Sequence, residues 1–216
     1  LAGYNGYPGP RMRSMLEGGQ LINLVRFLRA WSQWPGRSNG YGLKALLGQF
    51  VPSQLRGIAL KLIGRDPAPA WLNTSYFRDN GIAPGEFHEA EQSRDIYGRR
   101  LMDRLRGALT GNGLNALLRH GDRNSMRCSV ESRVPFMTID MAEFLLSLPE
   151  NYLISDQGET KHIFRAAMRG IVPDAILTRK DKIGFATPEQ AWLQQLDGQA
   201  LHWLGAADAL PFLNAQ

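Results

Sequence analysis

Residues 21–31 have the sequence LINLVRFLRAW, and the spacing of their apolar side chains decides the fold class. Leucine, valine and tryptophan recur every three or four residues, which is the period of one face of an α-helix. Pro35-Gly36 follows, a dipeptide that ends helices. The same period recurs in four later stretches, 55–62, 97–109, 114–118 and 141–148. These stripes predict an all-α fold, mostly or wholly helical.

Strand signals are scarce in this chain. Only residues 151–155, NYLIS, form a short extended candidate. There is no internal repeat and no low-complexity segment. We therefore expect residues 1–216 to form a single helical domain with at most one short strand pair and no parallel sheet.

Composition narrows the class of protein. The 216 residues are 44% hydrophobic and 21% charged, as in ordinary globular proteins. No apolar run approaches the ~18 residues of a membrane span, so no membrane partner is expected. Cys128 is the single cysteine, which fits a reducing compartment such as the cytoplasm. The scattered histidines show no zinc spacing, and we predict no metal site.

The net charge of +5 suggests anionic ligands. Basic side chains are not interleaved with aromatic ones in the way that stacks nucleic-acid bases. Small anions such as a nucleotide, pyrophosphate or a carboxylate are therefore favoured over nucleic acid.

A charged block, DRNSMRCSVESRVPF, occupies residues 122–136 between apolar runs. Continuing the 114–118 helix in steps of four places Asp122 on the apolar side. A buried carboxylate needs a partner, and Arg119 and Arg133 are both near in sequence. One interpretation is a structural ion pair that locks the helix to the next segment. The other is the wall of a site for a polar substrate.

A second basic pattern occurs in residues 158–170, GETKHIFRAAMRG. It predicts a helix with Thr160 as N-cap and Gly170 as C-terminal signal. Lys161 then lies in the first turn, where the helix dipole disfavours a cation, and it shares a face with Arg165 and Arg169. Either this face is solvated, or an anion is held by Lys161 and the helix N-terminus. The basic loop 179–185, RKDKIGF, leaves the same two interpretations open.

Three blocks, DRNSMRCSVESRVPF, GETKHIFR and RKDKIGFATPEQAWL, occur in the order and spacing of the C-terminal half of glutamine-hydrolysing asparagine synthetases. The chain resembles that family over most of its length, least distinctively in residues 37–95. The opening LAGYNGY resembles the stretch that follows the family's acidic Gly-x-Gly-x-Asp-Glu motif.

The resemblance implies a reaction. Mg-ATP adenylates the side-chain carboxylate of aspartate, and ammonia released from glutamine by an N-terminal glutaminase domain displaces AMP. The family's lysine near the reacting phosphates corresponds to Lys161, the expected catalytic residue. Candidates for the substrate and pyrophosphate cleft are Asp122, Arg123, Glu131, Arg133, Arg165 and Lys182. Alternatives are a related adenylating ligase, which forms β-lactams, cyclises peptides or amidates sugar acids, or a non-catalytic helical interaction module.

The chain departs from the family pattern in three places. It contains no Ser-Gly-Gly-x-Asp-Ser phosphate loop and no N-terminal glutaminase cysteine, and Met137-Thr138 stands where Leu-Asp is common. We therefore expect a fragment whose partner is the N-terminal half of the same protein, with no cofactor bound to the fragment itself. Apolar surface exposed at that junction leaves self-association, for example as a homodimer, open.

The missing phosphate loop generates the first prediction. The purified 216-residue chain should not catalyse ATP–pyrophosphate exchange with aspartate, because the backbone cradle for pyrophosphate and magnesium is absent. Exchange well above a protein-free control would contradict it.

Overall fold

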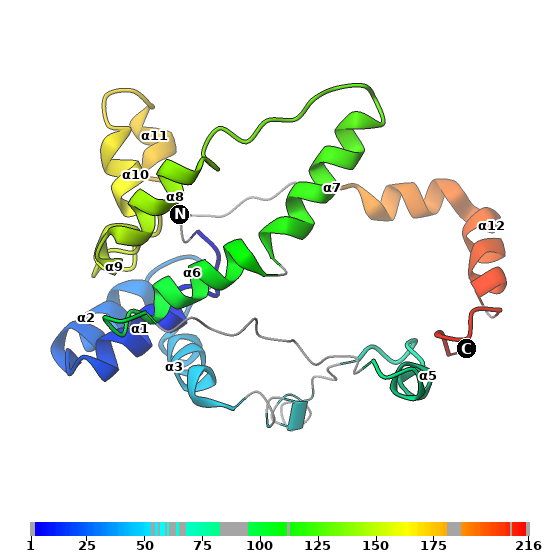
Figure 1. The fold of residues 1–216 in the computed structure, drawn as a ribbon, viewed down its shortest axis with the longest axis horizontal. Coiled ribbons are helices and arrows are strands. Elements are labelled where there is room, and N and C mark those ends of the chain that lie inside the picture. The colour runs from blue at the N-terminus through cyan, green and yellow to red at the C-terminus, as the bar shows by residue number, and fades with distance from the viewer. Residues whose placement is uncertain are drawn as a thin grey trace. The chain divides into compact units, whose positions relative to one another are not determined.

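The computed structural model describes residues 3–52, 55, 57–58, 60, 64, 68–82, 95–111, 113–180, 187–207 and 209–214 (Figure 1). Extended pairing within these residues is limited to three isolated bridges, Leu72 with Leu213, Ile154 with Thr160 and Arg169 with Val172. The predicted all-α class is therefore confirmed. None of the described helices is both long and apolar enough to cross a membrane.

The described helices follow one another along the chain and are labelled in Figure 1. In order they are α1 Pro8–Glu17, α2 Leu21–Ser32, α3 Asn39–Leu47, the 3-10 turn η1 Gly48–Phe50, α5 Thr74–Asp79, α6 Arg100–Thr110, α7 Leu114–Met126, α8 Ile139–Ser147, α9 Glu150–Leu153, α10 His162–Ala167, α11 Asp174–Leu177 and α12 Glu189–Ala207.

Four of the five predicted stripes correspond to described helices, α2, α6, α7 and α8. The stretch 55–62 lies largely outside the described residues. The strand expected at 151–155 is wrong, because residues 150–153 form the helical turn α9 after Pro149. Only Ile154 of that stretch pairs in an extended manner, with Thr160.

The chain divides into two compact units. The first contains residues 1–50 and 89–181, and the second contains residues 51–88 and 182–216.

The core of the first unit lies between α1, α2, α3 and α6. Met12 and Met15 of α1, Phe27 and Trp31 of α2 and Leu101 of α6 are fully buried. The rings of Phe27 and Trp31 stack with centroids 6.5 Å apart. Burying two large aromatic rings removes several hundred Å² of apolar surface from water, roughly 150–250 Å² for each ring.

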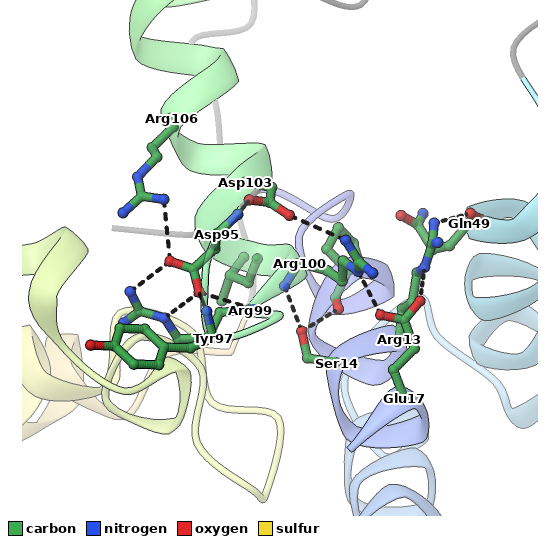
Figure 2. A network of polar contacts seen from close by, with 12 residues as sticks. Arg13, Ser14, Glu17, Gln49, Asp95, Tyr97, Arg99, Arg100, Asp103 and Arg106 are labelled. Carbon is green, nitrogen blue, oxygen red and sulfur yellow. Dashed lines mark hydrogen bonds and ion pairs between the residues drawn. The ribbon is translucent and has the colours of Figure 1, made fainter. Parts of the chain in front are cut away.

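Asp95 anchors the start of α6 (Figure 2). Its carboxylate accepts hydrogen bonds from Arg99 Nε at 2.9 Å and Nη2 at 2.8 Å, and from Arg106 Nη1 at 3.2 Å. It also accepts from the backbone N–H groups of Tyr97 and Arg99. The side-chain hydrogen bonds of Arg99 hold the pKa of Asp95 far below its usual range, against the opposing effect of burial.

Glu17 links α1 to α6 in the same network (Figure 2). It accepts from Arg13 Nε at 2.7 Å and from Arg100 Nε at 2.5 Å. Arg13 also donates to the carbonyl of Gln49 at 2.6 Å, which joins α1 to the 3-10 turn η1. A continuous set of charged contacts therefore fixes α1 against both neighbours.

The second unit is held by backbone contacts around α5. Asn73 caps α5 by accepting from Tyr76 N at 3.1 Å, and its own N–H donates to the carbonyl of Phe212 at 3.0 Å. Asn214 Nδ2 donates to the carbonyl of Leu72 at 3.1 Å. The C-terminal residues 211–214 thus lie along residues 70–73.

Asp95 generates a stability prediction. Asp95→Asn should lower the free energy of unfolding by about 2 kcal/mol near neutral pH, because it removes the charge that two arginines share in a buried position. Because the folded pKa is lowered, this contribution is complete above the unfolded pKa and is lost as pH falls through the folded pKa. The difference from wild type should therefore shrink by roughly 1 kcal/mol at about pH 3.

Urea unfolding at the two pH values measures this difference. The matched control is Asp79→Asn, an exposed aspartate at the end of α5, which should change stability by no more than ~0.5 kcal/mol. Equal losses in the two variants would contradict the assignment.

Candidate functional site

A tight reversal of the chain leads to Lys161. Ile154 pairs with Thr160, Ser155 N donates to the carbonyl of Glu159 at 3.0 Å, and Gly158 N donates to that of Ser155 at 2.9 Å. We call residues 154–161 the Lys161 turn. Gly158 has φ of +76°, and a Cβ there would lie 3.0 Å from Trp31 Cβ. The turn therefore lies directly on α2, and glycine is required for that approach.

A buried arginine of α1, Arg11, joins the exposed Asp156 of the Lys161 turn and the buried Glu150 of α9 to α1. Arg11 is 8% exposed, and it donates through Nη1 to Glu150 at 3.0 Å and through Nη2 to Asp156 at 3.1 Å. Glu150 Oε1 also accepts from Ser14 Oγ at 2.9 Å and from Leu101 N at 2.8 Å. Burial raises the pKa of Glu150, against the lowering effect of Arg11 and these hydrogen bonds.

Lys161 has left-handed backbone geometry, with φ 58° and ψ 31°. It is exposed, and no carboxylate among the described residues pairs with its ammonium. The left-handed conformation costs a residue with a side chain about 1–2 kcal/mol. Such strain persists only where the surroundings impose it, and it often marks a functional position.

The predicted N-cap is wrong. Thr160 is 7% exposed and pairs with Ile154, so α10 begins at His162 with Lys161 as the residue before it. The extended pairing of the Lys161 turn prevails over the local capping preference of threonine. Lys161 thus precedes the helix instead of occupying its first turn.

Arg165 braces the turn from the other side. Its Nε donates to the carbonyl of Thr160 at 3.0 Å, and its Nη1 donates to the carbonyl of Leu177. These contacts join the Lys161 turn, α10 and the end of α11. Because its guanidinium is engaged with backbone carbonyls, Arg165 is less available to a ligand than Lys161; its expected role in a cleft stays a prediction.

The charged block 122–136 lies on exposed structure. Asp122 and Arg123 are exposed on α7, which has no buried residue among those described. The expectation that Asp122 is buried is therefore wrong, because α7 packs chiefly at its start, against α6. Glu131 and Arg133 pair with each other at 2.9 Å, with side chains 66% and 79% exposed. An exposed pair of this kind contributes little stability.

The beginning of the basic loop reaches the end of α2. Lys180 Nζ lies 5.6 Å from the centre of the Trp34 ring, a cation–π contact. Lys182, another predicted cleft residue, lies outside the described residues. The described contacts bring Lys161 and Arg165 together around the Lys161 turn but do not link them to Asp122, Arg123, Glu131 or Arg133.

Apolar side chains next to the charged block are exposed. Phe136 is 55% exposed although its ring meets Phe164 edge-on at 5.3 Å, and Ile139 and Phe144 on α8 are 76% and 53% exposed. Thr138 caps α8 by accepting from Met141 N at 3.3 Å, so the departure from Leu-Asp leaves the helix start intact. These three side chains expose apolar surface beside the charged block; whether it is the surface expected at the junction with the N-terminal half stays a prediction.

Sequence reasoning missed Arg11 and Glu150. They are 139 residues apart, and no local pattern links them.

A sequence model of the asparagine synthase family matches residues 27–214, most of the chain. This chain belongs to the asparagine synthase family. Every predicted site residue lies within the matched span, whereas Arg11 lies outside it.

Two curated relatives support membership of the asparagine synthase family. Asparagine synthetase 1 (glutamine-hydrolyzing) of Bacillus subtilis (strain 168) is 37% identical over 78 residues, which cover 36% of this chain and 12% of that protein. Asparagine synthetase 3 (glutamine-hydrolyzing) of the same strain is 44% identical over 64 residues, which cover 30% of this chain and 10% of that protein. The chain therefore matches only a small part of each relative. No solved structure matches it.

The left-handed backbone of Lys161 predicts a difference in stability that can be measured on the 216-residue chain. Lys161→Gly should be more stable than Lys161→Ala by about 1 kcal/mol, because glycine adopts positive φ without the steric cost that alanine bears. Both variants lose the ammonium, so the comparison isolates the backbone. Urea unfolding measures it, and an alanine variant as stable as the glycine variant would show that the position is unstrained.

Proposed function

We propose that this chain is the helical part of the synthetase domain of a glutamine-hydrolysing asparagine synthetase, and that it serves ATP-dependent formation of the asparagine amide. Three observations support the proposal: membership of the asparagine synthase family, the order of the three sequence blocks, and the presentation of Lys161. The last is the observation on which the mechanism rests.

The proposed reaction has two steps. A carboxylate oxygen of the aspartate side chain attacks the α-phosphorus of ATP, and pyrophosphate leaves with the electrons of the broken P–O bond. Ammonia then attacks the acyl carbon, AMP leaves, and the amide nitrogen gives up a proton. Negative charge increases on the departing pyrophosphate in the first step, so a fixed cation stabilises that transition state.

Lys161 fits the role of this cation. Its ammonium is exposed and unpaired among the described residues, so its charge is available to a phosphate oxygen. Its backbone is held on one side by the Arg11–Asp156 contact and on the other by the Arg165–Thr160 contact. A cation that is already positioned needs little reorganisation during the reaction.

The basic loop supplies a second proposed cation. Lys182 is proposed for this role from the family resemblance of the block RKDKIGFATPEQAWL. We assign Lys182, together with Asp122, Arg123, Glu131, Arg133 and Arg165, to the polar wall of the cleft. The chain's resemblance to the family supports these assignments. The magnesium ligands and the phosphate loop are assigned to the N-terminal half of the same protein.

The decisive prediction concerns turnover of the full-length protein that carries this chain. Lys161→Ala should lower asparagine synthesis by about 100-fold or more, as removal of a preorganised electrostatic group does. Glutaminase activity should survive, because that chemistry belongs to another domain. Steady-state assays of both activities and a melting curve provide the measurement.

Two further variants sharpen this experiment. Lys44→Ala removes an exposed lysine of α3 in the same unit and should leave synthesis unchanged. Lys182→Ala shows whether the basic loop contributes the second cation. Near-normal synthesis by well-folded Lys161→Ala would overturn the role of Lys161, and loss of both activities with a lower melting temperature would mark the residue as structural.

A further inference from the structure

Gly3 lies against the stem of the Lys161 side chain. A Cβ built on Gly3 with ideal geometry would lie 2.7 Å from Lys161 Cε, 3.8 Å from Cδ and 3.7 Å from Nζ. The first separation is far below carbon–carbon contact, which is optimal near ~3.5–4.0 Å. Lys161 therefore occupies space that exists only because residue 3 has no side chain.

An alanine methyl group at residue 3 would collide with the side chain of Lys161. The collision is with the flexible end of a long side chain, so rotation about the lysine's terminal bonds relieves it at modest cost.

The contact joins two segments that are distant in the sequence. The Lys161 turn fixes the lysine backbone through Arg11 and Asp156, and Gly3 precedes the α1 helix that carries Arg11. The segment before α1 therefore contacts the stem of the lysine at Gly3, and Arg11 of α1 anchors the Lys161 turn. Together they limit where the ammonium can lie.

We propose that Gly3 is a positioning residue that sets the location of the Lys161 ammonium. The proposal concerns geometry first, and its catalytic consequence rests on the proposed function of Lys161. Displacing a reacting or stabilising group by ~1 Å can cost up to about 100-fold in rate. Gly3→Ala should therefore act through Lys161 and not through folding.

The geometric part is tested on the chain itself. It has five lysines, so reductive methylation with 13C-formaldehyde gives few side-chain signals in an NMR spectrum, and Lys161→Arg identifies the one from Lys161. Gly3→Ala should shift the Lys161 signal and leave those of the other four lysines in place. Gly6→Ala is the matched control, because a Cβ on Gly6 meets nothing within 4 Å. An unchanged Lys161 signal in Gly3→Ala would overturn the proposal.

Thermal melting covers the case in which Gly3→Ala perturbs folding. If the methyl group clashes with the lysine, Gly3→Ala should lower the melting temperature of wild type more than it lowers that of Lys161→Ala. An equal loss of melting temperature in both backgrounds would show that Gly3 is needed for folding and not for placing Lys161. That result would also overturn the proposal.

The catalytic part is tested in the full-length protein. Gly3→Ala should lower kcat for asparagine synthesis by about 10- to 100-fold with a smaller change in KM, because a displaced cation affects the transition state more than binding. Adding Gly3→Ala to Lys161→Ala should cause no further loss. If Gly3→Ala lowers kcat as much in Lys161→Ala as in wild type, it does not act through Lys161. If Lys161→Ala is fully active, the proposed function is wrong, and the NMR experiment alone tests the geometry.

Discussion

The buried carboxylate of Glu150 is the interaction on which the first unit depends. It is 3% exposed and accepts from Arg11 of α1, from Ser14 of α1 and from the backbone N–H of Leu101 in α6. Glu150 itself begins α9, which leads into the Lys161 turn. One side chain thus joins two core helices to the segment that presents the candidate catalytic lysine. Losing one partner of such a buried group leaves the others unsatisfied, at a cost of several kcal/mol, roughly 3–5.

The first turn of α6 shows how this arrangement satisfies backbone groups. The backbone N–H groups there donate to side chains outside the helix. Arg99 N donates to the Asp95 carboxylate, Arg100 N to Ser14 Oγ, and Leu101 N to the Glu150 carboxylate. Helix starts need such partners. Here the residues that cap α6 also hold α1, α6 and α9 together. The same hydrogen bonds therefore pair the free N–H groups of α6 and fix the packing of the core.

Strain at Lys161 belongs to this framework. A left-handed lysine is disfavoured locally, and hydrogen bonds on both sides, from Arg11 to Asp156 and from Arg165 to Thr160, hold its segment in place. Beside it, Gly3 leaves space for the stem of the side chain. Preorganisation of this kind suits a group that stabilises charge developing on a phosphate.

Periodicity predicted the helices well but not which face of each is buried. In α2, Leu24 and Trp31 are buried as the stripe implies, whereas Leu21 and Val25 are 58% and 46% exposed and Phe27 is buried in their place. A helical stripe spans a wide arc, and only the neighbouring helices decide which part of that arc is covered. Asp122 was misplaced for the same reason, because its helix has little packed against that end.

By itself the sequence determined the all-α class, five of the helices (α2, α6, α7, α8 and α10), the family and the lysine to test. These follow from short-range periodicity and from motifs whose residues lie close together in the chain. Only the tertiary structure decided that Thr160 pairs with Ile154 instead of capping α10, that Arg11 reaches Glu150 and Asp156, and that Gly3 borders Lys161. Each of these contacts joins residues from separate elements or overrides a local preference, and its energy exists only once the core has brought the partners together.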